Sequence, residues 1–301
     1  MITLKQLRYL EAIAQTGHFG RAAELVHISQ PALSAQIRAL EDRLGTILVK
    51  RLSNGARLTT VGEDIAARAK KILSAVGELQ EAAKMSQGVL AGRVRLGIIP
   101  SIAPYFLPKL LPELDVRFPQ LQLELRETIT EQLMRELMDG ALDVVILSLP
   151  IDEPTIETRA CFFDPFVLAC AKSRDLRADN SRFPAKDILN EQTLLLMEDG
   201  HCLRDQTLKV WESELTGARR SGGVSNMATL THLVEQDRGV ALLPELFINC
   251  ESGLSDRVNL IRLGDPEPGR QIGVVWRKTH PRGSDFDALA KLVREIGTQQ
   301  A

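Results

Sequence analysis

The chain has 301 residues, of which 44% are hydrophobic and 25% charged, and its formal net charge is −2. This length accommodates two or three domains of ordinary globular composition, and the charge excludes a chain that is basic throughout. The N-terminus lacks the pattern of a signal peptide, and no apolar run reaches the roughly 20 residues of a membrane span. We therefore expect a cytoplasmic protein without membrane contact.

The first sixty residues predict three short helices. Thr3 and Gln6 fit a capping box that opens the first helix, and the second covers about residues 20–26. In the third, SQPALSAQIRALEDRLG, Ser29 is a good N-cap and Pro31 suits the first turn. One face of this third helix repeats at helical spacing and predicts a buried stripe, made of Leu33, Ile37, Leu40 and Leu44.

The segment ILVKRLSNGARLT then predicts two short strands joined by Asn54-Gly55, a strong hairpin signal. Three helices and a hairpin make a winged helix-turn-helix, whose third helix enters the DNA major groove. Residues 1–60 carry eight Lys and Arg against four Asp and Glu, a local charge of +4 that phosphate contacts would need. A small helical domain with a solvated charged face is the alternative. The DNA contacts expected are Gln30, Pro31, Ser34, Ala35 and Arg38 at base edges, with Lys50 and Arg51 nearer phosphates.

A long helix is predicted over residues 59–85, which contain no proline. Its apolar residues alternate spacings of four and three, a heptad seam that suits a coiled coil between two chains. Packing of the helix on its own domain is the alternative. The seam consists of Ile65, Ala69, Ile72, Val76, Leu79 and Ala83.

The segment FGRAAELVHISQPALSAQIRALEDRLGTILVKR resembles the N-terminal signature of LysR-type transcriptional regulators. The resemblance implies that the long helix links a DNA-binding domain to an effector domain and pairs two subunits. It implies a homodimer, or a homotetramer, bound to an inverted repeat in double-stranded DNA, with RNA polymerase as a further partner. We expect a DNA-binding domain over 1–60, a linker over 61–90 and an effector domain over 91–301.

From about Arg93 onward, apolar strands alternate with helices, which predicts parallel α/β sheets. No GxGxxG motif or phosphate-binding loop supports nucleotide binding. The family resemblance implies two lobes like those of periplasmic binding proteins, lobe I over about 92–162 and 270–301 and lobe II over about 163–269. A ligand site would lie between them, lined by strand ends and helix N-termini.

The stretch MEDGHCLRDQ raises the possibility of a reactive thiol. Asp199 can N-cap a following helix, so Cys202 falls in the first turn, where exposed amides and the helix dipole favour a thiolate. His201 and Arg204 add positive character, which Asp199 and Asp205 oppose. Peroxide oxidises an accessible thiolate to a sulfenic acid, whereas a lone cysteine is more often a small buried hydrophobe.

Three segments, LLLMEDGHCLRDQ, LGIIPSIAPYFLPKLLP and PEPGRQIGVVWR, resemble the OxyR-like branch of the LysR family, which senses hydrogen peroxide. The resemblance implies that Cys202 is the redox-sensing residue, in a protein that is a regulator of the oxidative-stress response and not an enzyme. The second cysteine of this branch, nine residues further on, is replaced by Trp211. The peroxide pocket implied by the resemblance consists of Ser101, Thr130, His201, Arg204, Asp205 and Arg270.

Trp211 excludes the usual intramolecular disulfide and leaves the oxidised product open. Sulfenic acid, a mixed disulfide with a small thiol, and a disulfide with Cys161, Cys170 or Cys250 are the candidates, the last restricted by bonding distance. The four cysteines form no CxxC pair or close Cys/His spacing, so we expect no metal and no cofactor. Two other functions stay open: a LysR-type regulator that binds a small metabolite, with Cys202 incidental, and a thiol peroxidase-type enzyme.

Overall fold

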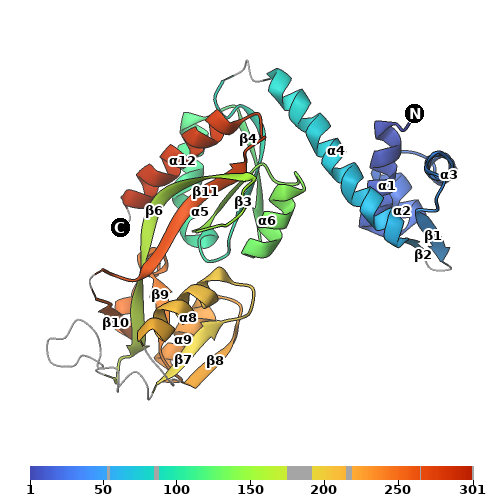
Figure 1. Ribbon diagram of the computed structural model, residues 1–301. Coiled ribbons are helices and arrows are strands. Elements are labelled where there is room, and N and C mark those ends of the chain that lie inside the picture. The colour runs from blue at the N-terminus through green and yellow to red at the C-terminus, as the bar shows by residue number, and fades with distance from the viewer. Residues whose placement is uncertain (53–54, 85–87, 175–191, 215–218, 265, 300–301) are drawn as a thin grey trace. The chain divides into compact units, whose positions relative to one another are not determined.

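The computed structural model describes residues 1–52, 55–84, 88–174, 192–214, 219–264 and 266–299. The chain divides into two compact units (Figure 1). The first consists of Met1–Ser86 with Met138–Ala141, and the second of Gln87–Leu137 with Leu142–Ala301. No helix among the described residues is long and apolar enough to cross a membrane.

The first unit contains the three predicted helices. The capping box at the start of α1 is confirmed, because the Gln6 amide donates to Thr3 Oγ1 and the Thr3 amide donates to Gln6 Oε1. Gly17 ends α1 in the left-handed conformation that glycine favours. The elements of this unit are α1 (Leu4–Thr16), α2 (Phe19–Leu25), α3 (Gln30–Leu44), β1 (Val49–Leu52), β2 (Gly55–Leu58) and α4 (Thr60–Lys84).

The core of this unit lies beneath α3. Leu33, Ile37 and Leu40 are buried as predicted, together with Leu10 and Ile13 of α1, whereas Leu44, the last residue of the predicted stripe, is only partly buried. The strands β1 and β2 pair antiparallel, which confirms the wing and hence the winged helix-turn-helix. In this hairpin Gly55 is the first residue of β2, while Ser53 and Asn54 lie outside the described residues, so the predicted Asn54-Gly55 turn stays a prediction.

The long helix α4 faces two environments along its length. Ile65 packs against the core of the first unit and Ala69 is buried. Further along, Ile72 and Leu79 are exposed, at 47% and 72%. The first two residues of the predicted seam therefore pack on the helix's own domain, as the alternative to a coiled coil requires. Two later residues of the seam are exposed to solvent. The side chain of Ala83 lies outside the described part of the structure.

A seven-stranded sheet runs through the second unit. Its strands follow the order β10-β6-β11-β5-β3-β4, with β9 also paired to β6, and β7 and β8 form a separate pair. The bounds are β3 (Gly92–Ile98), β4 (Leu121–Glu127), β5 (Val144–Leu149), β6 (Ile156–Ala171), β7 (Thr193–Met197), β8 (Arg219–Val224), β9 (Ala241–Pro244), β10 (Val258–Arg262) and β11 (Gly269–Arg277).

The prediction of parallel sheets is correct for some of these strands and wrong for others. The strands β3, β4 and β5 are parallel, as are β7 and β8. By contrast, β11 runs antiparallel to β5 and β6, and β6 runs antiparallel to β9 and β10. The reason is that the chain leaves the first lobe along β6 and returns along β11, in opposite directions (Figure 1).

Two lobes result, as the family resemblance implied. Lobe I contains β3, β4 and β5 with three helices, α5 (Ala103–Arg117), α6 (Thr130–Met138) and α12 (Gly283–Thr298). Lobe II has its own apolar core, which includes Leu194, Leu203, Leu230 and Phe247. Its helices are α8 (Cys202–Glu214), α9 (Met227–Glu235), α10 (Glu245–Ile248) and α11 (Leu254–Arg257). The strand β6 belongs to both lobes (Figure 1).

Candidate cysteine site and DNA interface

The exposed face of α3 carries four of the five residues predicted at base edges: Gln30, Pro31, Ala35 and Arg38. Ser34 is only 5% exposed, which differs from the exposure expected of its helix face, while its contact with DNA stays a prediction. Its hydroxyl accepts a hydrogen bond from Arg38 Nη2 at 3.3 Å and another from the guanidinium of Arg51 on the wing. The wing therefore covers position 34, and Ser34 holds two arginines in place instead of facing solvent.

The two basic residues of the wing have different surroundings. Lys50 is exposed. The Arg51 guanidinium lies 4.6 Å from the centre of the Phe19 ring, within the range of a cation–π contact, and also contacts Ser34. Arg51 is thus fixed against α2 and α3, whereas Lys50 lies on the surface. Contact of these residues with DNA stays a prediction.

Three hydroxyl side chains lie at one edge of lobe I. The strands β4 and β5 flank β3 in parallel, so all three strands end at the same edge of the sheet. Ser101 follows β3, Thr130 begins α6 after β4, and Ser148 is near the end of β5. The sequence prediction included the first two and missed Ser148. The feature of the sequence that could have identified Ser148 is that it is the only hydroxyl residue in the apolar run DVVILSLP.

Arg270 joins Ser101 to a buried acid on the neighbouring strand. Its Nη1 donates to Ser101 Oγ at 2.7 Å and its Nη2 donates to the Ser101 carbonyl at 3.0 Å. Its Nε donates to Asp164 Oδ2 at 2.9 Å. Arg270 and Asp164 are each 2% exposed. The structure therefore brings the predicted Ser101 and Arg270 into direct contact, and Asp164 is a partner that the sequence prediction missed.

The helix α8 begins at Cys202, which confirms that the cysteine lies in a first helical turn. Cys202 is half-buried, His201 is 8% exposed and Asp205 is exposed. The prediction that Asp199 caps this helix is wrong, because the residue before the helix is His201. The Asp199 carboxylate instead accepts a hydrogen bond from Arg204 Nε at 2.8 Å.

Arg204 is turned back toward the strand that precedes α8. Its Nη1 donates to the Met197 carbonyl at 3.0 Å, and a methyl group placed on Gly222 of β8 would lie 2.6 Å from the same nitrogen. The guanidinium therefore ties the first turn of α8 to the end of β7 and lies close to the β8 backbone. Its predicted place in a peroxide pocket stays a prediction, as do those of His201 and Asp205.

The start of α8 lies against the hydroxyl edge of lobe I. Gln206 Nε2 donates to Ser148 Oγ at 2.5 Å, which ties the second turn of α8 to the end of β5. A methyl group placed on Gly200 would lie 3.1 Å from Ile129 Cδ1, the residue before Thr130. Among the described residues, the buried oxygens Thr130 Oγ1 and Gln206 Oε1 have no hydrogen-bond partner. Both are polar groups available to a small oxygen-containing ligand.

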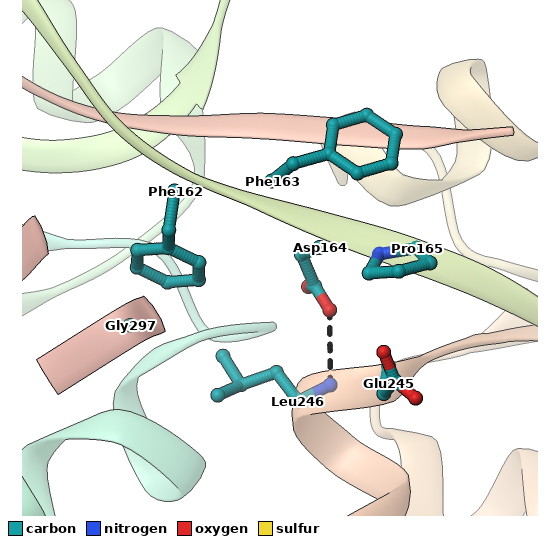
Figure 2. A pocket seen from close by; sticks show the side chains of 7 residues that line it. All are labelled: Phe162, Phe163, Asp164, Pro165, Glu245, Leu246 and Gly297. Atoms are coloured by element: carbon teal, nitrogen blue, oxygen red, sulfur yellow. Dashed lines mark hydrogen bonds between the residues drawn. The ribbon is translucent and has the colours of Figure 1, made fainter. Parts of the chain in front are cut away.

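A separate small indentation of about 10 Å³ is lined by residues of β6, α10 and α12 (Figure 2). None of the residues predicted for the peroxide pocket lines it. Figure 2 shows the Asp164 carboxylate directed at the backbone nitrogen of Leu246, which donates to Asp164 Oδ1 at 2.9 Å. The lining residues are Phe162, Phe163, Asp164, Pro165, Glu245, Leu246 and Gly297.

The other three cysteines differ in accessibility. Cys161 and Cys170 are buried on β6, whereas Cys250 is exposed. Burial raises the pKa of the Cys161 thiol to about 11, and its Sγ donates to the Ala290 carbonyl at 3.4 Å. The described residues contain no cluster of three or more His, Cys, Asp and Glu arranged to hold a metal ion.

Comparison with known families decides the class of the chain. Residues 4–63 match the bacterial regulatory helix-turn-helix proteins of the lysR family, and residues 87–297 match the LysR substrate binding domain. The chain belongs to the LysR family of transcriptional regulators. A member of this family binds DNA through the winged helix-turn-helix, so the first unit of this LysR regulator is its DNA-binding part.

Relatives of this LysR regulator cover nearly its full length. A probable hydrogen peroxide-inducible genes activator from Streptomyces viridosporus is 38% identical over 294 residues, which cover 97% of this chain and 94% of the relative. A full-length OxyR variant from Pseudomonas aeruginosa has a TM-score of 0.78 and 33% identity, and the match covers 98% and 95% of the two chains. A peroxide-bound OxyR mutant from Corynebacterium glutamicum has a TM-score of 0.63 and 31% identity, and that match covers 99% and 95%.

Proposed function

We propose that this LysR regulator senses hydrogen peroxide by oxidation of Cys202 and controls genes of the oxidative-stress response. One observation carries the proposal: a half-buried thiol begins α8 and lies in a segment held against the hydroxyl edge of lobe I. The names of the relatives, which are peroxide-inducible activators and OxyR proteins, favour this function over metabolite sensing.

The proposed pocket combines the predicted residues with two further side chains. Ser148 and Gln206 join it because their hydrogen bond brings α8 to the sheet edge. Thr130 Oγ1 and Gln206 Oε1 are buried polar atoms that a peroxide molecule can satisfy. The predicted members are Ser101, Thr130, His201, Arg204, Asp205 and Arg270.

The chemical step is a two-electron oxidation of sulfur. The Cys202 thiolate attacks one peroxide oxygen, an S–O bond forms, and the O–O bond breaks. The leaving hydroxide takes a proton and becomes water, so peroxide is reduced while the thiol becomes a sulfenic acid.

We propose that the oxidised state is a sulfenic acid or a mixed disulfide with a small thiol. Trp211 stands at the position where the resemblance predicts a second cysteine. Cys161 and Cys170 are buried on β6, and the raised pKa of Cys161 keeps it a protonated thiol near neutral pH. A disulfide from Cys202 to either would require a buried thiol to reach Cys202 with the two Cα atoms within about 7 Å.

The signal would pass from α8 to paired subunits and then to DNA. Exposed Ile72 and Leu79 on α4 support pairing of two chains through the linker, as a dimer or a tetramer. We propose domains over 1–60, 61–90 and 91–301, an inverted-repeat operator, and RNA polymerase as a further partner. Binding to chromosomal DNA implies a cytoplasmic location and a regulatory, not an enzymatic, role.

The test compares the wild-type chain with Cys202→Ser and, as a matched control, Cys250→Ser. Each reduced full-length protein receives one equivalent of peroxide and is analysed by intact-mass spectrometry and operator footprinting. We expect the wild-type chain and the Cys250→Ser control to gain one oxygen and to change their footprints on DNA. We expect Cys202→Ser to do neither. An unchanged response in Cys202→Ser would refute the proposal, and sustained peroxide turnover with a thiol reductant would indicate an enzyme.

A further inference from the structure

Asp164 and Arg270 face each other across the two strands that join the lobes. They are register partners in the antiparallel pair of β6 and β11, although 106 residues separate them in sequence. A methyl group on the preceding residue, Gly269, would lie 2.6 Å from the Asp164 carbonyl oxygen and 2.8 Å from Pro165 Cα. The two backbones therefore approach closely, and this approach fixes the distance between the carboxylate and the guanidinium.

Both oxygens of the Asp164 carboxylate are engaged. Oδ2 accepts from Arg270 Nε at 2.9 Å, and Oδ1 accepts from the Leu246 amide at 2.9 Å (Figure 2). The Arg270 side chain is fully buried and the Asp164 side chain is 2% exposed. A buried carboxylate with both oxygens satisfied cannot rotate without losing a hydrogen bond, so it holds the guanidinium in one orientation.

That orientation sets the direction of the hydrogen bond at Ser101. A guanidinium has only donors, so Ser101 Oγ must accept the hydrogen bond from Arg270 Nη1 at 2.7 Å. Nη2 donates to the Ser101 carbonyl and fixes the serine backbone as well. The hydroxyl proton of Ser101 is then directed away from Arg270 and is available to donate to another oxygen.

We propose that Asp164 is a positioning residue for the peroxide reaction, which acts through Arg270 to make the Ser101 hydroxyl a hydrogen-bond donor. This inference rests on the proposed function. As the Cys202 thiolate forms its S–O bond and the O–O bond breaks, negative charge develops on the leaving oxygen. The Ser101 hydroxyl donates to that oxygen, which takes a proton from solvent and departs as water, while Cys202 becomes a sulfenic acid. No other oxidant than peroxide is needed.

The test measures two reactions of Cys202 in the reduced full-length chain. The first is oxidation by peroxide, followed by trapping of the sulfenic acid and peptide mass spectrometry. The second is alkylation by iodoacetamide, which attacks the same sulfur but leaves no oxygen to stabilise. Asp164→Asn keeps the shape of the side chain and removes its charge. We expect it to slow peroxide oxidation by about tenfold to a hundredfold, less than the roughly hundredfold to thousandfold effect of removing such a donor outright, and to leave alkylation unchanged.

Two comparisons show whether Asp164 acts through Ser101. In a Ser101→Ala background the Asp164→Asn substitution should have no further effect on the peroxide rate. Asp285→Asn is the matched control, since Asp285 is another buried acid that accepts from an arginine, Arg282 Nε at 2.8 Å. We expect Asp285→Asn to leave the ratio of the two rates unchanged.

The outcomes separate this inference from the proposed function. If wild-type Cys202 does not react with peroxide, both fail. If wild type reacts with peroxide, three results overturn the inference alone. The first is that Asp164→Asn reacts with peroxide as fast as wild type, and the second is that it loses peroxide oxidation and alkylation to the same extent. The third result is that Asp164→Asn slows peroxide oxidation further in the Ser101→Ala background. Should Asp164→Asn not fold, Arg270→Lys replaces it. A lysine keeps the buried charge but cannot donate to both partners in this geometry, so the selective loss of peroxide reactivity must appear there.

Discussion

The hydrogen bond from Gln206 to Ser148 predicts how firmly α8 is held in the reduced protein. Ser148→Ala removes the acceptor of Gln206 Nε2, a hydroxyl in a residue that is 4% exposed. The substitution removes one hydrogen bond of a partly buried side chain, a loss of about 1 kcal/mol. Local opening of α8 should then be favoured by about fivefold.

Amide hydrogen exchange followed by mass spectrometry measures this opening directly. In the reduced full-length chain, peptides from the start of α8 should exchange about fivefold faster in Ser148→Ala, while peptides from α12 keep the wild-type rate. Thr231→Val is the matched control. Its hydroxyl is equally buried but donates to the Met227 carbonyl at 2.8 Å within α9, so α8 exchange should not change.

Two results would refute the reasoning. If α8 exchanges at the wild-type rate in Ser148→Ala, the hydrogen bond to Gln206 does not hold the helix. If amide exchange in α12 accelerates as much as in α8, the substitution destabilises the whole unit, and the hydrogen bond from Gln206 to Ser148 does not stabilise α8 locally.

Further predictions concern reactivity, pH, packing and DNA. A brief exposure to N-ethylmaleimide at neutral pH should label Cys250 and Cys202 before Cys161, whose burial and pKa of about 11 keep it an unreactive thiol; peptide mass spectrometry gives the order. Burial alone would raise the pKa of Asp143, but hydrogen bonds from His280 and Arg95 hold it well below its ordinary 3.8. The stability that this carboxylate contributes is therefore present above about pH 4 and lost below it, so Asp143→Asn should flatten the acid limb of a plot of Tm against pH. Gly62→Ala should cost the first unit about 1–3 kcal/mol in urea unfolding, because the added methyl would lie 2.1 Å from the Leu48 carbonyl oxygen. Arg38→Ala should weaken operator binding, and equal affinity by fluorescence anisotropy would contradict its place at the DNA.

The sequence predicts best what is encoded locally. The box at Thr3, the stripe beneath α3 and the position of Cys202 in a first helical turn depend on residues within a few positions of each other, and all three are confirmed. The direction of β6 and β11 could not be predicted, because an apolar run such as IGVVWRK is the same whether its neighbours are parallel or antiparallel.

The candidate site shows the same limit. Ser101 and Arg270 could be named from the family resemblance, whereas Asp164, Ser148 and Gln206 take part through contacts made only in the folded chain. The burial of Ser34 was missed for a similar reason. Its position on α3 suggests exposure, but the guanidinium of Arg51, 17 residues further on, covers it.

The continuity of β6 has a thermodynamic consequence for the second unit. Its first half pairs with β11 beside lobe I, and its second half pairs with β9 and β10 in lobe II. The two sets of hydrogen bonds are separate, but they are made by one continuous strand, so disorder in either half of β6 removes the fixed end on which the other half begins. We therefore expect the second unit to melt in one calorimetric transition.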